Sequence, residues 1–208
     1  MTEIKLELYR KKSLEELSEA LSKPESKCQS GTAAAVAAAL SAALLCRAAA
    51  MTDKGGERLG YIRHNAENLR VYMAKLADDD VSCRAPMNRA AKEGDTSALQ
   101  ACIPPACSVC SEMINMCSHL VELMTELSNY SPREAGHFLA EAAQLAVCAA
   151  RMAETYILDL SAMSEDDTFR FVARRENELY ISQFEPKALS LIEDQRKASA
   201  DPLKNSHF

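Results

Sequence analysis

Residues 31–44 read GTAAAVAAALSAAL, and this stretch decides the fold. Alanine has the highest helix propensity because it loses no side-chain freedom in a helix. Residues 33–45 carry no charge and Ser41 is their single polar residue, so a helix here needs cover on nearly every side. We therefore expect a buried alanine-rich helix, either at the centre of a bundle or covered partly by a second subunit. Its larger side chains form a ridge at every fourth position: Val36, Leu40 and Leu44.

The composition of the whole chain also favours helices. Aromatic residues make up 5% of the 208 residues and tryptophan is absent, while Ala, Leu, Glu, Lys and Met dominate. Six glycines and seven prolines allow few turns, so the helices should be long. We expect an all-α fold, a single domain over residues 1–208 built as a bundle of five to seven helices.

Charge and hydropathy exclude several classes of partner. The net charge is −6, and Lys and Arg are interleaved with acids, which predicts no nucleic-acid partner. The first twelve residues contain no apolar stretch typical of a signal peptide, and residues 33–46 are too short to span a membrane before Arg47. We expect a cytoplasmic protein with no membrane partner, whose eight cysteines are mostly reduced thiols.

Capping patterns predict where several helices begin. Ser13 and Glu16 form a capping box, and Thr32 is placed to cap the alanine-rich helix. Residues 131–134, SPRE, have the same pattern with proline at the first helical position. Residues 164–167 are expected to start a further helix.

Glycine and proline predict the breaks. After Gly55-Gly56, a long amphipathic helix is expected to bend or end near Pro86. Pro104 and Pro105 suit a helix start or an entry kink, and Pro186 should separate a final segment. We expect the tail, residues 198–208, to be frayed.

Two motifs in the sequence are typical of metal sites, but each lacks the further ligands that such a site needs. The C-x-x-C of Cys107 and Cys110 has no second C-x-x-C or H-x-x-x-H to complete a zinc site, and with Ile114 and Cys117 it shares one helical face. The Glu-x-x-His that ends at His137 occurs once, whereas a di-iron bundle needs it twice. We expect no metal.

The order of three strings carries a family resemblance: residues 31–44, LADDDVSC at residues 76–83, and SPREAGHFLAEAAQLAVCAARMAE at residues 131–154. Over residues 13–160 the chain resembles the cyclodeaminase/cyclohydrolase family, which comprises the cyclodeaminase domain of formimidoyltransferase-cyclodeaminase and related bacterial methenyltetrahydrofolate cyclohydrolases. The resemblance implies an all-α fold, a homodimer or higher homo-oligomer, and a folate site beside the glycine loop. It implies either deamination of formiminotetrahydrofolate or hydrolysis of methenyltetrahydrofolate, with no cofactor beyond the tetrahydrofolate substrate.

The resemblance assigns site residues. Both reactions need proton transfer at a one-carbon bridge, which a carboxylate held near the ring can perform, and Asp80 takes that catalytic role. The substrate-binding residues implied are Ser30, Gly31, Thr32 and Glu134. Each also has a simpler explanation: Asp80 as one of three solvated acids, Glu134 as a capping residue, and the loop residues as a helix cap.

The chain departs from the family pattern mainly at ligand-facing positions. The family's PTPGGGS loop corresponds to SKCQSGT at residues 26–32, and Arg84 replaces an aromatic residue after the acid. The family's S-D-A-G becomes R-E-A-G at residues 133–136, and its N-V-x-I-N-L becomes TYILDL at residues 155–160. Two functions stay open: a divergent folate enzyme, or a catalytically inactive relative that uses the same helical dimer to bind another small molecule or a protein.

Overall fold

Six α-helices and two short 3-10 helices build the part of the chain that the structure, a computed structural model, describes, residues 8–200; no strand occurs in this part. In chain order they are η1 (Tyr9–Lys11), α1 (Leu14–Ser22), α2 (Ser30–Ala50), α3 (Gly56–Glu93), α4 (Thr96–Leu127), η2 (Arg133–Ala135), α5 (Gly136–Ala162) and α6 (Asp167–Ala200). This confirms the all-α prediction and the expected number of helices. Of the tail expected to fray, residues 198–200 belong to α6, and the rest lies outside the described residues.

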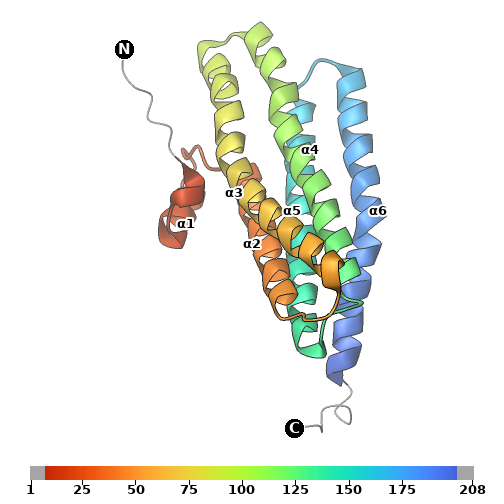
Figure 1. The fold of residues 1–208 in the computed structure, drawn as a ribbon. Coiled ribbons are helices and arrows are strands. Elements are labelled where there is room, and N and C mark those ends of the chain that lie inside the picture. The colour runs from red at the N-terminus through yellow and green to blue at the C-terminus, as the bar shows by residue number, and fades with distance from the viewer. Residues whose placement is uncertain (1–7, 201–208) are drawn as a thin grey trace.

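The long helices form one bundle (Figure 1). Helix α2 packs between α3 and α5, α4 packs against both of those, and α6 packs against α4 and α5. Helix α1 stands apart beside the bundle, near the start of α2 (Figure 1). Helix α4 therefore contacts all the other long helices, and the short α1 is fastened by its buried Leu17, which packs with Tyr9 and Cys28.

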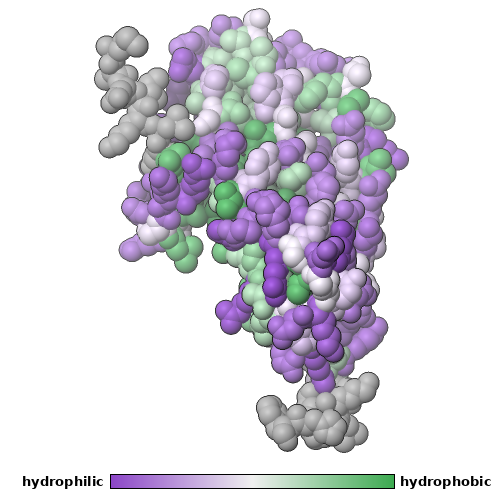
Figure 2. Space-filling view, viewed as in Figure 1, coloured by the Kyte–Doolittle hydropathy of each residue, from purple (hydrophilic) through white to green (hydrophobic). Residues whose placement is uncertain are grey.

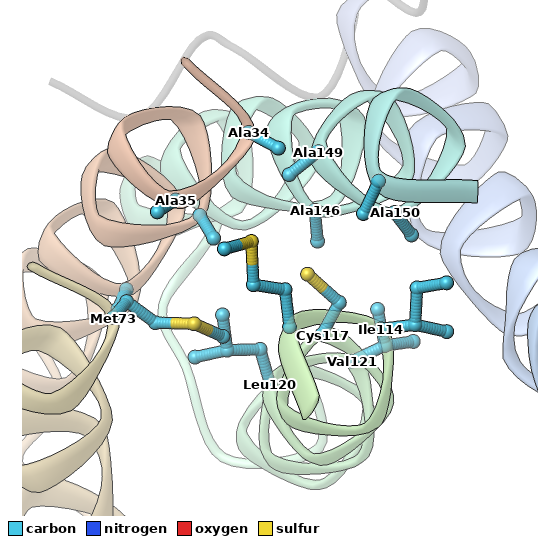
Figure 3. Packing of buried hydrophobic residues seen from close by; sticks show 14 of the residues in the cluster. Ala34, Ala35, Met73, Ile114, Cys117, Leu120, Val121, Ala146, Ala149 and Ala150 are labelled. Atoms are coloured by element: carbon cyan, nitrogen blue, oxygen red, sulfur yellow. The ribbon is translucent and has the colours of Figure 1, made fainter. Parts of the chain in front are cut away.

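The core pairs large side chains on α4 with small ones on α2 and α5. Ile114, Cys117, Leu120 and Val121 are fully buried, and in Figure 3 Cys117 points toward Ala146 of α5 while Leu120 lies toward Met73 of α3. Alanine lets helix backbones approach closely, so one row of larger residues fills the space between them. Ser41 keeps its hydroxyl satisfied in this core by donating to the carbonyl of Ala142 at 2.7 Å.

The outer side of α2 is only partly covered. Its alanine faces pack against α3 and α5, but the ridge points outward: Leu40 is 54% exposed, and Val36 and Leu44 are half-buried. Of the two arrangements expected for this helix, burial partly by a second subunit is the one this geometry leaves open.

Among the described helices, α2 is also the one that is long and apolar enough to cross a membrane, with a mean hydropathy of 1.8. This is weak support for a membrane span, because core helices of soluble proteins pass the same test. Ten of its residues are buried against its neighbours within the bundle.

Prolines do not break the helices as expected. Pro86 lies inside α3, Pro104 and Pro105 inside α4, and Pro186 inside α6. All four prolines are exposed, so the carbonyl that each leaves without an N–H partner lies on the water-facing side of its helix. Helix α4 instead begins at Thr96, after the N-cap Asp95, whose carboxylate accepts from the N–H of Ala98 at 2.9 Å.

The capping predictions have mixed outcomes. The capping box of Ser13 and Glu16 is present with both hydrogen bonds. The prediction of a capping box at residues 131–134 is wrong. The 3-10 helix η2 forms there, with Pro132 as an N-cap that makes no side-chain hydrogen bond, and α5 starts only at Gly136. Thr32 does not cap α2 either, because the N-cap is Gln29 and the hydroxyl of Thr32 binds elsewhere.

Candidate functional site

Three consecutive acids in the middle of α3 face three different surroundings. Asp78 is buried and contacts Arg10, whose N–H donates to it at 3.2 Å and whose guanidinium lies 3.1 Å away. Asp79 pairs with Lys75 on the surface at 3.4 Å. Asp80 is fully buried, so it is not the solvated acid of the simpler interpretation.

Asp80 lies where α3 crosses the start of α2. The hydroxyl of Thr32 donates to its Oδ2 at 2.7 Å. Arg84, one turn further along α3, donates from Nε to Oδ1 at 3.2 Å and from Nη2 to Oδ2 at 3.1 Å. Three donors and the opposite charge therefore hold the carboxylate in one orientation, which an isolated buried acid could not keep without a large desolvation cost.

Gly31 makes this approach possible. A Cβ built on Gly31 would lie 2.7 Å from Cγ of Asp80 and closer still to Oδ1. No residue with a side chain fits there unless the carboxylate moves. The single glycine kept in this loop is thus explained by contact with the acid.

Arg84 is itself buried, with 1% of its surface exposed. Its Nη2 also donates to the carbonyl of Lys27 at 3.0 Å, and its guanidinium lies 5.2 Å from the ring centre of Tyr156. Burial opposes the charge of Arg84, but the neighbouring carboxylate outweighs it, and the pKa of Arg84 is raised above its ordinary value. The guanidinium of Arg84 therefore stays charged.

Tyr156 and Gln29 close the site on the α5 side. The hydroxyl of Tyr156 donates to Oε1 of Gln29 at 2.9 Å, which ties the C-terminal half of α5 to the N-cap of α2. Burial raises the pKa of the Tyr156 hydroxyl, so this group stays neutral and available as a hydrogen-bond donor.

Thiols surround the pair without being activated by it. Cys83 donates to the carbonyl of Asp80 at 3.2 Å, and burial raises its pKa to about 11. Burial also raises the pKa of Cys107 to about 11, and that of Cys110 well above its ordinary value. Nucleophilic cysteines need a lowered pKa, so these side chains act as small apolar groups.

The structure brings together some of the predicted site residues and not others. Asp80, Gly31 and Thr32 form one cluster, although 48 residues separate the acid from the threonine. Ser30 is exposed at the edge of this cluster. Glu134 is exposed in η2, at the opposite end of α2, a helix about 30 Å long. Within one chain, Glu134 is therefore not part of this site.

Sequence reasoning missed the parts that Arg84 and Tyr156 play. Both lie in strings that depart from the family pattern, and the structure shows that these departures meet in space: Arg84, Tyr156 and the altered loop at residues 26–32 contact one another. The sequence therefore shows each of these departures from the family pattern, but it does not show that the residues contact one another.

No metal-binding cluster occurs in residues 8–200, where no group of three or more His, Cys, Asp or Glu side chains is placed to hold an ion. All eight cysteines, including Cys107 and Cys110, are free thiols.

Comparison with known proteins identifies the family. The sequence profile of the formiminotransferase-cyclodeaminase family matches residues 13–177. The chain belongs to this family. Membership places it in folate one-carbon metabolism with a cyclodeaminase-like function.

A solved structure with the same fold supports the assignment. The crystal structure of formiminotetrahydrofolate cyclodeaminase from Thermotoga maritima superposes with a TM-score of 0.79 at 20% identity, covering 88% of this chain and 97% of that one. No curated protein sequence matches significantly. At this identity the likeness to the cyclodeaminase shows a shared fold over nearly the whole of both chains.

Proposed function

We propose that this family member is an active formiminotetrahydrofolate cyclodeaminase in which Asp80 moves the protons. The observation that carries the proposal is the cluster at the start of α2, where a buried carboxylate is held by Thr32 and Arg84 against a glycine. A general acid or base needs a fixed orientation toward the reacting nitrogen, and three donors supply it.

The reaction asks for two proton transfers at one place. N10 of the folate attacks the protonated formimino carbon on N5 and loses its proton, which gives a five-membered ring with an amino group on the bridging carbon. The amino group then takes up a proton and leaves as ammonia, and the bridge becomes the methenyl cation. A single carboxylate that accepts the first proton and delivers the second balances both steps, and Asp80 is the acid that the cluster positions for this.

The test is direct. Purified chain is incubated with formiminotetrahydrofolate, and methenyltetrahydrofolate and ammonia are measured together. Equal amounts of both products, formed in proportion to protein, support the proposal. If the chain instead consumes methenyltetrahydrofolate and releases formyltetrahydrofolate, the related hydrolysis is its reaction. No turnover and no folate binding at high protein concentration would contradict both.

One observation favours a second candidate, a catalytically inactive relative. Asp80 is 0% exposed and its two oxygens already bind three donors, so a substrate has to reach it by displacing part of the cover. An inactive relative that keeps the helical fold would bind another small molecule or a protein, and it would form neither methenyltetrahydrofolate nor ammonia in the same incubation.

We propose further that the chain works as a homodimer or higher homo-oligomer. The outward ridge of α2 supports this, since Leu40 is more than half exposed on a helix whose other faces are buried. In Figure 2, green and pale-green atoms interrupt the mostly purple surface along α2, below α1. A second copy would cover an apolar helix face that is costly to leave in water.

We propose that the reaction takes place in the cytoplasm. It needs no metal and no cofactor beyond the tetrahydrofolate substrate itself. The residues that carry the chemistry are a carboxylate, a hydroxyl and a guanidinium, which together supply proton transfer and hydrogen bonds. Elemental analysis of purified, active protein tests the last point, and stoichiometric metal would contradict it.

A further inference from the structure

One nitrogen of Arg84 makes no hydrogen bond with any residue of the described range, 8–200. Nε and Nη2 form a side-on fork to Asp80, and Nη2 also donates to the carbonyl of Lys27. The nitrogen left over is Nη1, which is buried. Because the guanidinium is planar, the N–H groups of Nη1 point away from Asp80.

Such a group is rarely left without an acceptor. A buried donor on a charged side chain loses its hydration on folding, and in most proteins that loss is offset by a hydrogen bond. Nε and Nη2 of Arg84 are both paired within the site, so the unpaired donor is Nη1. An oxygen atom of a ligand could accept the hydrogen bond that Nη1 does not make within the chain.

The start of α2 beside Arg84 also favours an oxygen. The N-cap residue Gln29 makes no side-chain bond to the first turn, because its amide oxygen accepts from Tyr156 instead. The first N–H groups of the helix thus lack a side-chain cap, and they favour negative or partly negative atoms nearby.

Resting on the proposed function, we propose that Arg84 is a substrate-binding residue whose Nη1 donates to the carbonyl oxygen O4 of the pterin ring. In a tetrahydropterin, O4 and N5 are neighbours on the same edge of the fused rings. Asp80 acts at the bridge between N5 and N10, and Arg84 is fixed to Asp80 by the fork. A ring that presents its one-carbon bridge to Asp80 therefore presents O4 to the guanidinium.

The cover over this site is weakly fastened. Residues 23–29 pass over Arg84, and Cys28 packs with Tyr9 and Leu17 in a small cluster that is separate from the main core. Helix α1, which precedes this loop, stands beside the bundle in Figure 1. Displacing the loop costs the hydrogen bond from Arg84 to Lys27, the one from Tyr156 to Gln29 and a few apolar contacts, whereas the long helices stay in place.

The test compares a pair of ligands that differ at one atom. Tetrahydrofolate carries O4, an acceptor, and tetrahydroaminopterin carries a 4-amino group, a donor that cannot accept from Arg84. Dissociation constants for both are measured anaerobically with the wild type, Arg84→Lys and Arg63→Lys. Lysine at position 84 keeps a cation for Asp80 but lacks Nη1. Arg63 is the control for the same substitution away from the site: it lies exposed on the same helix and binds the carbonyls of Ala49 and Thr52 at the far end of α2.

We expect the wild type and Arg63→Lys to bind the 4-oxo ligand about tenfold to a hundredfold more tightly than the 4-amino ligand, the size of one hydrogen bond to a charged group. Arg84→Lys should bring this ratio close to one. If Arg84→Lys weakens both ligands equally, Arg84 has only a structural role and the proposal is wrong. If Arg84→Lys does not fold, the double variant Asp80→Asn with Arg84→Gln, which carries neither charge, replaces it. If this double variant keeps the wild-type preference for the 4-oxo ligand over the 4-amino ligand, the proposal is wrong.

A third ligand, tetrahydropteroate, lacks the glutamate tail and tests the other oxygen source. If the loss in Arg84→Lys disappears when the tail is absent, Arg84 binds a tail carboxylate and the assignment to O4 is overturned. If the wild type binds none of the three ligands, the proposed function fails together with this inference. Binding by the wild type with an unchanged ratio in Arg84→Lys overturns this inference alone.

Discussion

The carboxylate of Asp80 lies against the bare α-carbon of Gly31, so closely that a Cβ on Gly31 would be 2.7 Å from Cγ of the acid. This contact joins two of the three strings that carry the family resemblance, the one at the start of α2 and the one in the middle of α3. It also explains why a loop that has lost its other glycines keeps this one.

Replacing Gly31 with alanine should therefore destabilise the protein. Overpacking a tight contact costs about 1–3 kcal/mol, and the displaced carboxylate would lose its bond from Thr32. The control is Gly60→Ala in α3, where a Cβ meets nothing within 4 Å and helix propensity predicts a gain of about 0.5–1 kcal/mol. Urea unfolding of both variants decides the matter. Equal changes in the two would show that Gly31 and Asp80 are not in contact.

Removing Arg84 should cost more than removing both members of its pair. Arg84→Met leaves a buried carboxylate without its cation, which is destabilising by about 3–5 kcal/mol. Asp80→Asn combined with Arg84→Met removes both charges and should recover a substantial part of that loss. Thermal and urea unfolding of the two single variants and the double variant give the coupling. Additive losses would mean that the two side chains act independently.

The sequence predicts the all-α class and names Asp80 as the acid. It does not predict features that depend on which side of a helix faces water, such as where helices end and which residues stay exposed. Pro86 and Pro186 do not end their helices because both lie on exposed faces, and exposure is a property of packing. The ridge at Leu40 was expected to need cover, but its direction depends on how α3 and α5 pack.

The same limit applies to the site. Asp80, Gly31 and Thr32 could be named because a family resemblance carries them, yet the bond between the acid and Thr32 spans 48 residues. Arg84 was noted as a substitution, but its partner Tyr156 lies on another helix, so the contact between them could not be inferred. Glu134 was grouped with the site although α2 separates it from Asp80.

The buried cysteines should make the protein less stable at alkaline pH. Burial raises the pKa of the fully buried Cys117 to about 12, whereas a thiol in the unfolded chain ionises near pH 8.5–9. Above the unfolded pKa the unfolded chain binds fewer protons than the folded one, so the free energy of unfolding falls as pH rises.

Between pH 8 and pH 10, Cys117 should contribute about 1.5–2 kcal/mol of this fall. Cys117→Ala should remove that part of the slope, even though it also lowers stability at every pH by leaving a cavity. Val121→Ala, a buried truncation on the same helix that removes no thiol, should keep the wild-type slope. Urea unfolding across this pH range measures all three proteins, and parallel slopes for Cys117→Ala and the wild type would refute the prediction.

A charge on the ridge of α2 should separate the proposed subunits. Leu40→Glu places a carboxylate in the middle of the apolar face, and we expect the molar mass in solution to fall to that of one chain. Leu189→Glu on α6 is the control, because Leu189 is equally exposed, at 55%, but lies away from α2. Light scattering coupled to size exclusion measures both. An unchanged mass for Leu40→Glu would remove α2 from any interface.

The most direct test of the account is the rate of ammonia release from formiminotetrahydrofolate by the wild type, Asp80→Asn and Asp79→Asn. Asp79 is the neighbouring acid that pairs with Lys75 at the surface, so its variant controls for the loss of one negative charge on the same turn. We predict that Asp80→Asn lowers the rate by about a hundredfold or more, the size of a general acid–base contribution, and that Asp79→Asn stays within about twofold of the wild type. Equal rates for the wild type and Asp80→Asn would contradict the central role of Asp80.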